Sequence, residues 1–351
     1  MMNRIATLCR VCLVLASLCG AAWAQEMRRL AACLAIAAGA LAFASSLPSL
    51  AQTYPTKPIR LIVPFPPGGS TDVLGRIVAT RLAEAVGQQV IVDNRGGAGG
   101  VIGTDIVVKS PPDGHTLLFS ASAPIAINVT LMKSVPYDPL RDLAPVIRVA
   151  SVPLVLVIHP SVPARSVKEF IALLRQRPND FTYASPSTGT PQHLSAELFK
   201  TLANVRMTHI PYKGSGPAMT DVIAGQVPIT FEVFITALPY VKAGRLRALA
   251  QTGAVRSPHL SDVPTIAETG VPAYESSGWY GVLAPAGTPA AIVGRVHGEI
   301  ARIMAGPDMK QRMVELGADP AADTPEQFTQ FIRAETVKWA KVIRDSGATA
   351  D

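Results

Sequence analysis

Short apolar runs alternate with amphipathic segments along most of this chain, and the alternation limits the fold more than any other feature. Runs typical of strands cover residues 59–63, 90–92 and 117–119, and segments with helical spacing cover residues 73–86 and 100–108 between them. Strands that alternate with helices build a parallel sheet with helices on its faces. The first part of the chain is therefore predicted to be an α/β domain.

The same pattern starts again after Pro139. A strand-like run at residues 154–158 precedes a predicted helix that ends near residue 175, and a run at residues 181–184 leads into a second helical stripe. Ser166 and Glu169 fit a capping box at the start of the first of these helices. A chain with about 300 residues of this pattern is long enough for two domains, each with its own core.

The first junction between a strand and a helix reads VPFPPGGSTD, residues 63–72. Its glycines let a ligand approach bare backbone N–H groups, and the N-terminus of the helix behind them carries partial positive charge. Such a junction suits an anion. The glycine-lysine-serine or glycine-lysine-threonine of a nucleoside triphosphate site does not occur in the sequence, so a triphosphate is not expected.

A second glycine cluster, at residues 97–103, comes close to the fingerprint of a dinucleotide site. A dinucleotide fold places its glycines tight against the strand end and an acidic residue at the end of the next strand. Here residues 93–95 stand before the glycines, and Asp113 precedes the next apolar run instead of following it. These glycines are therefore predicted to form a turn that leads into a short helix, and no cofactor is expected.

A second small-residue junction, SPSTGTPQH at residues 185–193, follows a strand-like run of the second domain. If both junctions face one cleft, backbone N–H groups and hydroxyls can hold a small carboxylate from two sides without lysine or arginine. The candidate hydroxyls are those of Ser70, Thr71, Ser187, Thr188 and Thr190. Ordinary helix capping explains each single hydroxyl equally well.

Two export-like segments occupy the first 51 residues. The second begins at Met27, continues with two arginines and an apolar run, and ends at Ala51 in the small-x-alanine pattern that signal peptidase cleaves. A true start at Met27 explains the tandem arrangement and predicts export to the periplasm. Two membrane spans, or a lipoprotein anchored at Cys33, are the alternatives, but both apolar runs are shorter than the ~20 residues of a spanning helix.

All four cysteines lie in this leader, at positions 9, 12, 19 and 33. After cleavage the chain has no thiol for disulfides, catalysis or metal binding, and no metal site is expected. Cleavage also removes four of the 32 basic and one of the 25 acidic residues, which leaves a net charge of +4. So mild a charge does not indicate binding to nucleic acid.

Seven segments in a fixed order carry a resemblance to a known family. They read PIRLIVPFPPGGSTDVLGR, VDNRGGAGGVIGTDIV, DGHTLLF, YASPSTGTPQHLSAELF, IPYKGSGPAMTDVIAGQV, DVPTIAETGVP and APAGTP. Together they resemble the substrate-binding proteins of tripartite tricarboxylate transporters, the TctC-like receptors of the Bug family. The resemblance runs from Tyr54 almost to the C-terminus, and the ordered set is far more specific than one motif alone.

The resemblance implies a two-lobe periplasmic binding protein, an α/β Venus flytrap of the type II-like kind with two crossover strands. The first lobe would contain residues 52–150 and 252–351, the second residues 151–251, and the crossovers would lie near residues 144–153 and 247–253. It further implies a monomeric receptor that closes on a small carboxylate and passes it to the membrane subunits of a transporter. Di- and tricarboxylates, acidic amino acids and aromatic acids all fit such a site.

The resemblance also implies ligand contacts in both lobes, largely through main-chain donors. The first lobe would contribute Phe65, Gly68, Gly69, Ser70, Thr71 and Asp72. The second would contribute Ser185, Thr188, Gly189, Thr190 and His193, with Tyr212, Lys213 and Gly214 nearby and Glu232 at the distal end of the ligand. No catalytic residue is expected among them.

Four side chains need separate interpretation. Asp72 either holds an ammonium group of the ligand or is simply a favourable acid in the first turn of a helix. His193, at a helix start, is interpreted as a residue that orders its loop, and Trp279 as a core residue. Glu232 stands where the family commonly has an aspartate, so the identity of the distal ligand group stays open.

A secreted hydrolase is the competing functional class, because an exported α/β protein with serines and histidines could be one. The GxSxG motif of such enzymes and the HExxH motif of metalloproteases are both absent from the sequence. The predicted function is therefore that of a periplasmic receptor without enzyme activity.

Overall fold

Strands β1 (Ile59–Val63), β2 (Val90–Asn94) and β3 (Thr116–Ala121) form the parallel part of a first sheet. Helix α2 (Ser70–Val86) joins β1 to β2, and η1 (Ala98–Gly100) with α3 (Val101–Val108) joins β2 to β3. The structure, a computed structural model, describes residues 23, 34 and 54–350. The predicted signal segments and the proposed start at Met27 lie outside the described residues.

Strand β4 (Leu143–Ile158) is shared by two sheets. Its first part pairs with β9 (Ser277–Pro285) in the first sheet, and from Leu154 on it pairs with β7 (Ile229–Val233) and β8 (Arg247–Gln251) in a second sheet. Strands β5 (Thr182–Ser185) and β6 (Thr208–Pro211) complete the second sheet. The strand order is β2-β1-β3-β9-β4-β7-β5-β6, and both β8 and the short β10 (Asp319–Pro320) pair with β4.

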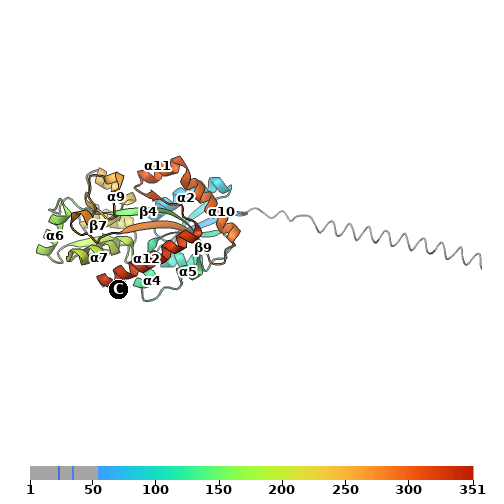
Figure 1. Cartoon of the computed structure of the whole chain (residues 1–351), viewed down its shortest axis with the longest axis horizontal. Helices are drawn as coiled ribbons and strands as arrows, with labels where there is room; N and C mark the ends of the chain where they lie inside the picture. Colours follow the sequence, from blue (N-terminus) through green and yellow to red (C-terminus); the bar gives the residue numbers. More distant parts are fainter. Residues whose placement is uncertain (1–22, 24–33, 35–53, 351) are drawn as a thin grey trace, which may run out of the picture. The chain divides into compact units, whose positions relative to one another are not determined.

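The two long strands β4 and β9 lie side by side through the middle of the fold (Figure 1). β4 passes between the sheets at residues 153–154, at the end of the crossover predicted near residues 144–153. Residues 247–251, predicted as part of the second crossover, instead form β8 within the second sheet. The chain that follows folds back on β8, because Gln251 Nε2 donates to the carbonyls of Leu260 and Val263, and it returns to the first sheet only at β9. The lobe boundaries at residues 150 and 252 stay predictions.

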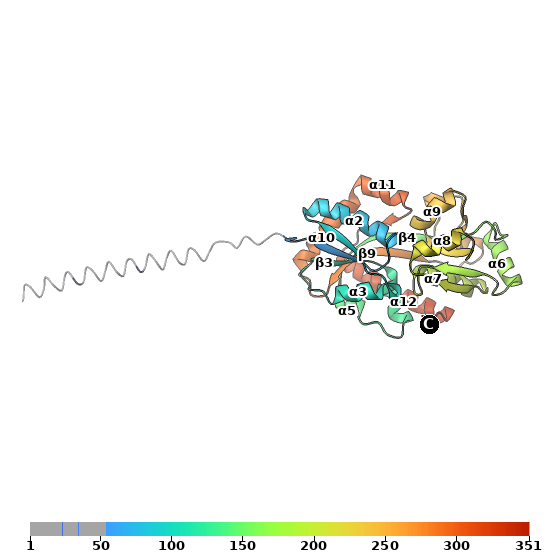
Figure 2. The same cartoon turned by 180° about the vertical axis from the view of Figure 1, so that it is seen from behind.

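Helices cover both sheets. Helix α6 (Val167–Gln176) precedes β5, while α7 (Pro191–Ala203), α8 (Ser215–Ile223) and α9 (Phe234–Lys242) follow β5, β6 and β7. Helices α10 (Ala290–Ala305), α11 (Pro307–Glu315) and α12 (Pro325–Ser346) follow β9. Seen from behind, α2, α3 and α10 group around the first sheet and α6 to α9 around the second (Figure 2). Helix α12 contacts both α4 (Asn128–Leu131) and α7, so it touches helices that belong to each sheet.

Capping residues and apolar spacing in the sequence predict the ends of these helices to within a few residues. Helix α2 begins at Ser70, three residues before the start predicted from apolar spacing, and ends at Gly87, which has a left-handed φ of 69° as a C-cap glycine requires. Ser166 caps α6 by accepting from the N–H of Glu169. The Glu169 carboxylate accepts from the N–H of Arg165 rather than from that of Ser166. Only half of the predicted capping box is therefore present.

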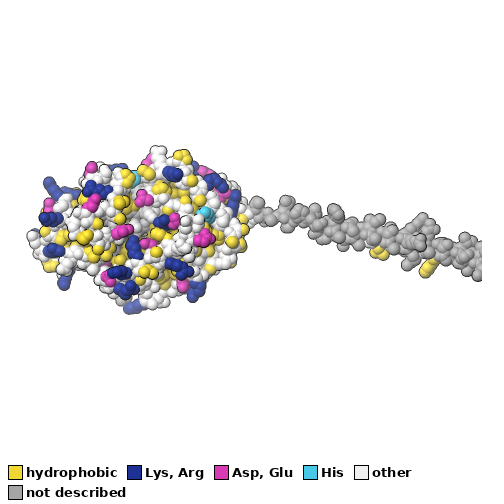
Figure 3. All heavy atoms as spheres, in the orientation of Figure 1, with side chains coloured by type: hydrophobic (Ala, Val, Ile, Leu, Met, Phe, Trp, Pro, Cys, Tyr) yellow, Lys and Arg dark blue, Asp and Glu magenta, His cyan; other side chains and the backbone are white. Residues whose placement is uncertain are grey.

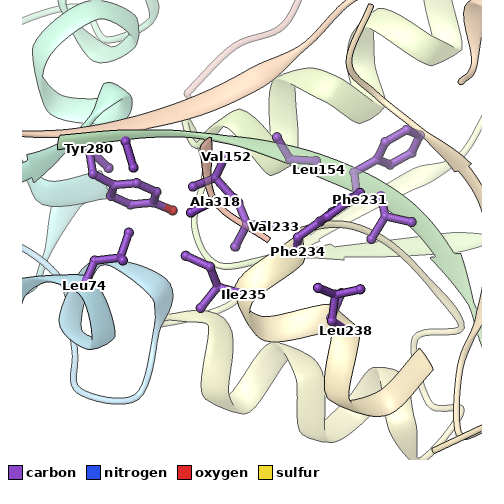
Figure 4. Packing of buried hydrophobic residues seen from close by; sticks show 14 of the residues in the cluster. Leu74, Val152, Leu154, Phe231, Val233, Phe234, Ile235, Leu238, Tyr280 and Ala318 are labelled. Atoms are coloured by element: carbon purple, nitrogen blue, oxygen red, sulfur yellow. The ribbon is translucent and has the colours of Figure 1, made fainter. Parts of the chain in front are cut away.

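The larger of two hydrophobic clusters within residues 54–350 runs beneath both sheets. Figure 4 shows Tyr280 and Leu74 at one end of this core and Phe231 and Leu238 at the other, and all four side chains are buried. A continuous core of this kind fixes the strand ends relative to one another. It therefore supports the loops that leave those ends.

Candidate functional site

The carboxyl ends of β1, β3, β5, β6 and β7 meet around one cavity. In open α/β sheets, ligands bind just outside the carboxyl ends of parallel strands. The cavity is lined by Phe65, Pro66, Gly69, Ser70, Thr71, Ala121, Ser122, Ala123, Pro186, Thr190, Pro191, Gln192, Gly214, Ser215, Val233, Gly278, Trp279 and Tyr280. Residues that follow strands of both sheets thus share one cavity, with residues of β9 completing its wall.

The loop between β1 and α2 is held by the carboxylate of Asp72. Its Oδ2 accepts from the N–H of Gly68 at 3.0 Å, and its Oδ1 accepts from Asn94 Nδ2 at 3.0 Å and pairs with Arg76 at 2.9 Å. Burial by itself would raise the pKa of Asp72, but these hydrogen bonds and the Arg76 charge outweigh it and lower the pKa below its ordinary value. The contacts favour the interpretation of Asp72 as a structural acid.

The first turn of α2 borders the cavity. Its N-cap residue is Gly69, and within residues 54–350 no side chain caps the N–H groups of this turn. Ser70 and Thr71 are buried and line the cavity. The hydroxyl of Ser70 forms a 2.7 Å hydrogen bond with that of Tyr280 on β9. The Ser70 hydroxyl is therefore engaged, while the backbone donors of the turn are suited to an anion.

The loop between β5 and α7 is held by its own polar side chains. The hydroxyl of Ser185 donates to the carbonyl of Ser187 at 2.9 Å and lies 2.7 Å from His209 Nε2. The Thr190 hydroxyl donates to the same carbonyl at 2.8 Å and accepts from the N–H of His193, which caps α7. In turn, His193 Nδ1 accepts from the N–H of Gly189 at 3.2 Å. His193 therefore orders its loop through a direct hydrogen bond.

A stack of three rings, with Tyr183 and His193 buried and His209 partly buried, lies against this loop. The rings of His193 and His209 are 4.1 Å apart, and Tyr183 stacks on His209 at 4.9 Å. Tyr183 donates to the Glu197 carboxylate, which also accepts from Lys200 at 2.8 Å. Burial, together with the neighbouring positive charge, lowers the pKa of His193 to about 4 and that of His209 to about 3. Both imidazoles are therefore neutral near pH 7.

The structure brings part of the predicted site together. The predicted residues that line the cavity are Phe65, Gly69, Ser70, Thr71, Thr190 and Gly214. Tyr212 and Lys213 line a neighbouring groove with the glycines of residues 96–100. The lining does not include Gly68, Asp72, Ser185, Thr188, Gly189, His193 or Glu232. Ligand contacts of all these residues stay predictions.

Several residues that line the cavity are not predicted from the sequence as site residues. Ser122 and Trp279 are both buried, and neither Ser122 Oγ nor Trp279 Nε1 has a hydrogen-bond partner in the described part of the chain. Trp279 also packs edge-on against Phe328 and Phe331, so it belongs to the core as predicted and lines the cavity as well. Ser122 follows β3 just as Ser70 follows β1, and the same junction rule applied to residues 117–119 would have found it.

Gly189 and Gly214 lie where loops that follow the second sheet contact loops that follow the first. A Cβ atom at Gly189 would lie 2.0 Å from Asn128 Oδ1, and one at Gly214 would lie 3.3 Å from Cγ of Pro66. Asn128 is fully buried and donates to the carbonyl of Gly99 at 3.0 Å. The two sides of the cavity wall are thus in close contact, which fits a closed conformation.

The charge of the cavity comes from the backbone rather than from side chains. No charged side chain is part of its lining among the described residues. On the face of the molecule drawn in Figure 3, basic and acidic side chains are interspersed. In residues 54–350 no cluster of histidine, cysteine and acidic side chains could hold a metal ion, and no helix there is long and apolar enough to cross a membrane.

Comparison with known proteins identifies the family. Residues 74–348 match the tripartite tricarboxylate transporter family receptor, TctC. The chain belongs to this family. Among curated relatives, the protein BugT of Bordetella pertussis is 43% identical over 325 residues, which cover 92% of this chain and 99% of BugT. The predicted membership of the Bug family is therefore confirmed.

Solved structures of TctC and Bug proteins share the fold. Rpa4515 of R. palustris with adipate superposes with a TM-score of 0.83 at 40% identity, covering 84% of this chain and 99% of that one. MatC from Rhodopseudomonas palustris with bound malate gives 0.78 at 28% identity, covering 83% and 100%. The predicted fold class, a two-lobe α/β periplasmic binding protein, is confirmed by these similarities.

Proposed function

We propose that this TctC-family receptor captures a small carboxylate in the cavity between its two sheets. The observation that carries the proposal is the uncapped first turn of α2, which borders a cavity without charged side chains. An anion there would be held by backbone N–H groups and the positive end of a helix. The unpartnered Ser122 Oγ and Trp279 Nε1 are further donors in the same wall.

The relatives support a carboxylate over other anions. Two solved proteins of the same fold carry adipate and malate, and both ligands are carboxylates. The family description also names a tricarboxylate transporter. The proposal therefore includes a periplasmic location, action as a monomer, and delivery of the ligand to the membrane subunits of a transporter of that type.

The proposal excludes a catalytic role. A serine–histidine hydrogen bond does exist between Ser185 and His209, as a hydrolase would need. Ser185 is fully buried, however, and it does not line the cavity. Its hydroxyl instead donates to the carbonyl of Ser187. This pair therefore supports a loop, and a receptor is the better account of the site.

A thermal-shift screen tests the function directly. The probes are di- and tricarboxylates, hydroxy acids, acidic amino acids and aromatic acids. A ligand at 100 times its Kd adds about 2.7 kcal/mol to the free energy of unfolding, which raises the melting temperature by several degrees. Failure of every carboxylate to raise it would contradict the proposal.

Ser70→Asp tests the place of the carboxylate. It adds a negative charge beside the first turn of α2, and like charges about 4 Å apart repel by ~4 kcal/mol at an effective dielectric near 20. We expect an affinity loss of about a thousandfold. The empty protein should stay folded, because an acid is favourable at a helix N-terminus.

Calorimetric titration with the best ligand from the screen measures this loss. Ser187→Asp is the matched control, because Ser187 lines only the neighbouring groove, and it should reduce affinity much less. Wild-type affinity in a folded Ser70→Asp protein would place the carboxylate elsewhere.

A further inference from the structure

Glu232 on β7 is a carboxylate buried behind the cavity. Its side chain has no exposed surface. Its Oε1 accepts two hydrogen bonds, from Gln192 Nε2 at 3.0 Å and from the N–H of Val233 at 2.9 Å. Its Oε2 has no hydrogen-bond partner in the described part of the chain, although the hydroxyls of Ser215 and Thr236 lie close to the carboxylate. Gln192, the first of these donors, lines the cavity.

These contacts fix which way the amide of Gln192 is turned. The N–H of Val233 can only donate, so Glu232 Oε1 must be an acceptor. If the carboxyl binds a proton, the proton belongs on Oε2, and Oε1 stays an acceptor. In both states Gln192 has to direct its NH₂ group at Oε1. The amide oxygen of Gln192 is then the atom of this side chain that is available to a ligand in the cavity.

We infer that Glu232 orients Gln192 and thereby makes the cavity select for a hydrogen-bond donor on the ligand. The donor, such as a hydroxyl or ammonium group, would lie next to the Gln192 amide oxygen. The inference rests on the proposed function and narrows the ligand class to hydroxy or amino monocarboxylates. Glu232 is a positioning residue in this scheme, because it acts through Gln192 and does not line the cavity.

A second carboxylate that meets Gln192 would face an acceptor instead of a donor. It would meet the oxygen of Gln192, an acceptor like itself, with the Glu232 carboxyl directly behind. The cavity lining has no lysine or arginine among the described residues. Lys213 lies in the neighbouring groove instead. A hydroxyl or ammonium group in the same place would gain a hydrogen bond.

Burial also raises the pKa of Glu232, although Gln192, the N–H of Val233 and the hydroxyls of Thr236 and Ser215 oppose the rise. A protonated Glu232 weakens the repulsion of a second carboxylate but leaves the orientation of Gln192 unchanged. The orientation of the amide, and not the charge of Glu232, therefore carries the selection.

Matched ligand pairs test the inference. Each pair has the same chain length and differs at one end: succinate, glutarate and adipate against the ω-hydroxy and ω-amino acids of the same carbon number. We expect the tightest-binding hydroxy or amino acid to bind the wild-type protein at least about tenfold more tightly than its dicarboxylate counterpart in calorimetric titration at pH 7. Equal or tighter binding of the dicarboxylates would overturn the inference and leave the proposed function intact. Binding of no carboxylate at all would overturn both.

Variants separate the positioning role from a structural one. Glu232→Gln keeps an oxygen that accepts from Val233 and Gln192, so it should keep the wild-type preference. Glu232→Met removes that acceptor and frees the amide of Gln192. The ratio of the two Kd values within each ligand pair should then fall to near one. A purely structural role of Glu232 would weaken both members of a pair equally and leave their ratio unchanged. That result, or a lost preference in Glu232→Gln, would overturn the inference.

Two further variants keep the test decisive if Glu232→Met does not fold. Gln192→Met removes the amide itself, and we expect it to weaken the hydroxy or amino acid about tenfold and the dicarboxylate little. Thr236→Val is the control, because the Thr236 hydroxyl approaches Glu232 but donates to the carbonyl of Val233. It should leave the preference unchanged. An unchanged preference in Gln192→Met would contradict the inference.

Discussion

The two loops that border the cavity are built by different physical means. The loop after β1 depends on an ionised carboxylate, since Asp72 accepts from Gly68, Asn94 and Arg76. The loop after β5 depends on neutral groups, with Ser185 against His209 and a backbone N–H on the His193 ring. The first loop thus leaves its helix turn uncapped, whereas the second uses its hydroxyls to hold itself together.

The difference shows where ligand contacts are to be sought. In the second loop Thr190 caps α7 with its hydroxyl, and that of Ser185 donates to a carbonyl. In the first loop Gly69 is the N-cap residue and offers no side chain. The first loop is therefore the better place for an anion, and the second loop serves mainly to shape the wall opposite.

The largest difference between the loops should appear when each left-handed glycine receives a methyl group. A Cβ at Gly189 would lie 2.0 Å from Asn128 Oδ1 and 3.0 Å from Leu131, whereas one at Gly68 would have no atom within 4 Å. Both have positive φ, so Ala adds similar strain at each, about 1–2 kcal/mol in stability. Only Gly189→Ala also opposes the closed conformation, at about 3 kcal/mol.

We therefore expect Gly189→Ala to lower ligand affinity by about a hundredfold, because the clash disappears when the two sides of the wall separate. Gly68→Ala should lower the melting temperature by a similar strain but change affinity less than threefold. Titration calorimetry with the best ligand of the screen measures both. Equal affinities in the two variants would show that contact between Gly189 and Asn128 plays no part in closure.

Much of the fold follows from the sequence, because periodicity and chain punctuation are local properties. The strand at residues 59–63 and the end of α2 at Gly87 come directly from such patterns. The sharing of β4 between two sheets depends on partners more than 70 residues away, such as Val233 and Ser277, and no local pattern specifies them. The fold-back after β8 is likewise set by the side chain of Gln251, whose partners no periodicity reveals.

The site was harder to predict than the fold for a similar reason. The sequence places Ser70 and Thr190 correctly at helix starts beside the cavity. It cannot tell whether a hydroxyl holds its own loop or a ligand, because both roles need the same group. The partners that decide this, His209 for Ser185 and Tyr280 for Ser70, come from distant strands.

A smaller effect distinguishes the loops by their response to acid. The lowered pKa values of His193 and His209 mean that the folded state binds fewer protons than the unfolded state, whose histidines titrate near pH 6.5. Stability is therefore full above pH 6.5 and declines as the pH falls, by about 2 kcal/mol per histidine between pH 6.5 and pH 5. Glu197 and Tyr183 are the ionisable groups next to the pair, and the charge of Lys200 acts on both histidines.

His209→Gln should remove about 2 kcal/mol of this pH dependence, because it keeps an amide near Ser185 but cannot titrate. Urea unfolding at a series of pH values measures how the free energy of unfolding changes with pH.

Asp72→Asn is the counterpart in the first loop. The pKa of Asp72 is lowered from 3.8, so its stabilisation is present above pH 3.8 and is lost only below it. Asp72→Asn should therefore leave the slope between pH 6.5 and pH 5 unchanged, and an unchanged slope in His209→Gln would contradict the neutral stack.

The smallest expected effect concerns the Ser70 hydroxyl, which links the first loop to β9. The hydroxyls of Ser70 and Tyr280 form a 2.7 Å hydrogen bond. Both residues are buried, so bulk water does not readily replace either partner. Ser70→Ala and Tyr280→Phe should each reduce stability by about 1 kcal/mol, and the double variant should lose little more than either one, because they remove the same bond. Thr190→Ala removes a hydroxyl confined to the second loop, so its effect should add to that of Tyr280→Phe. If the losses of Ser70→Ala and Tyr280→Phe add instead, and Ser70→Ala also weakens the ligand more than tenfold, the Ser70 hydroxyl serves the ligand rather than β9, and the contrast between the two loops fails at this residue.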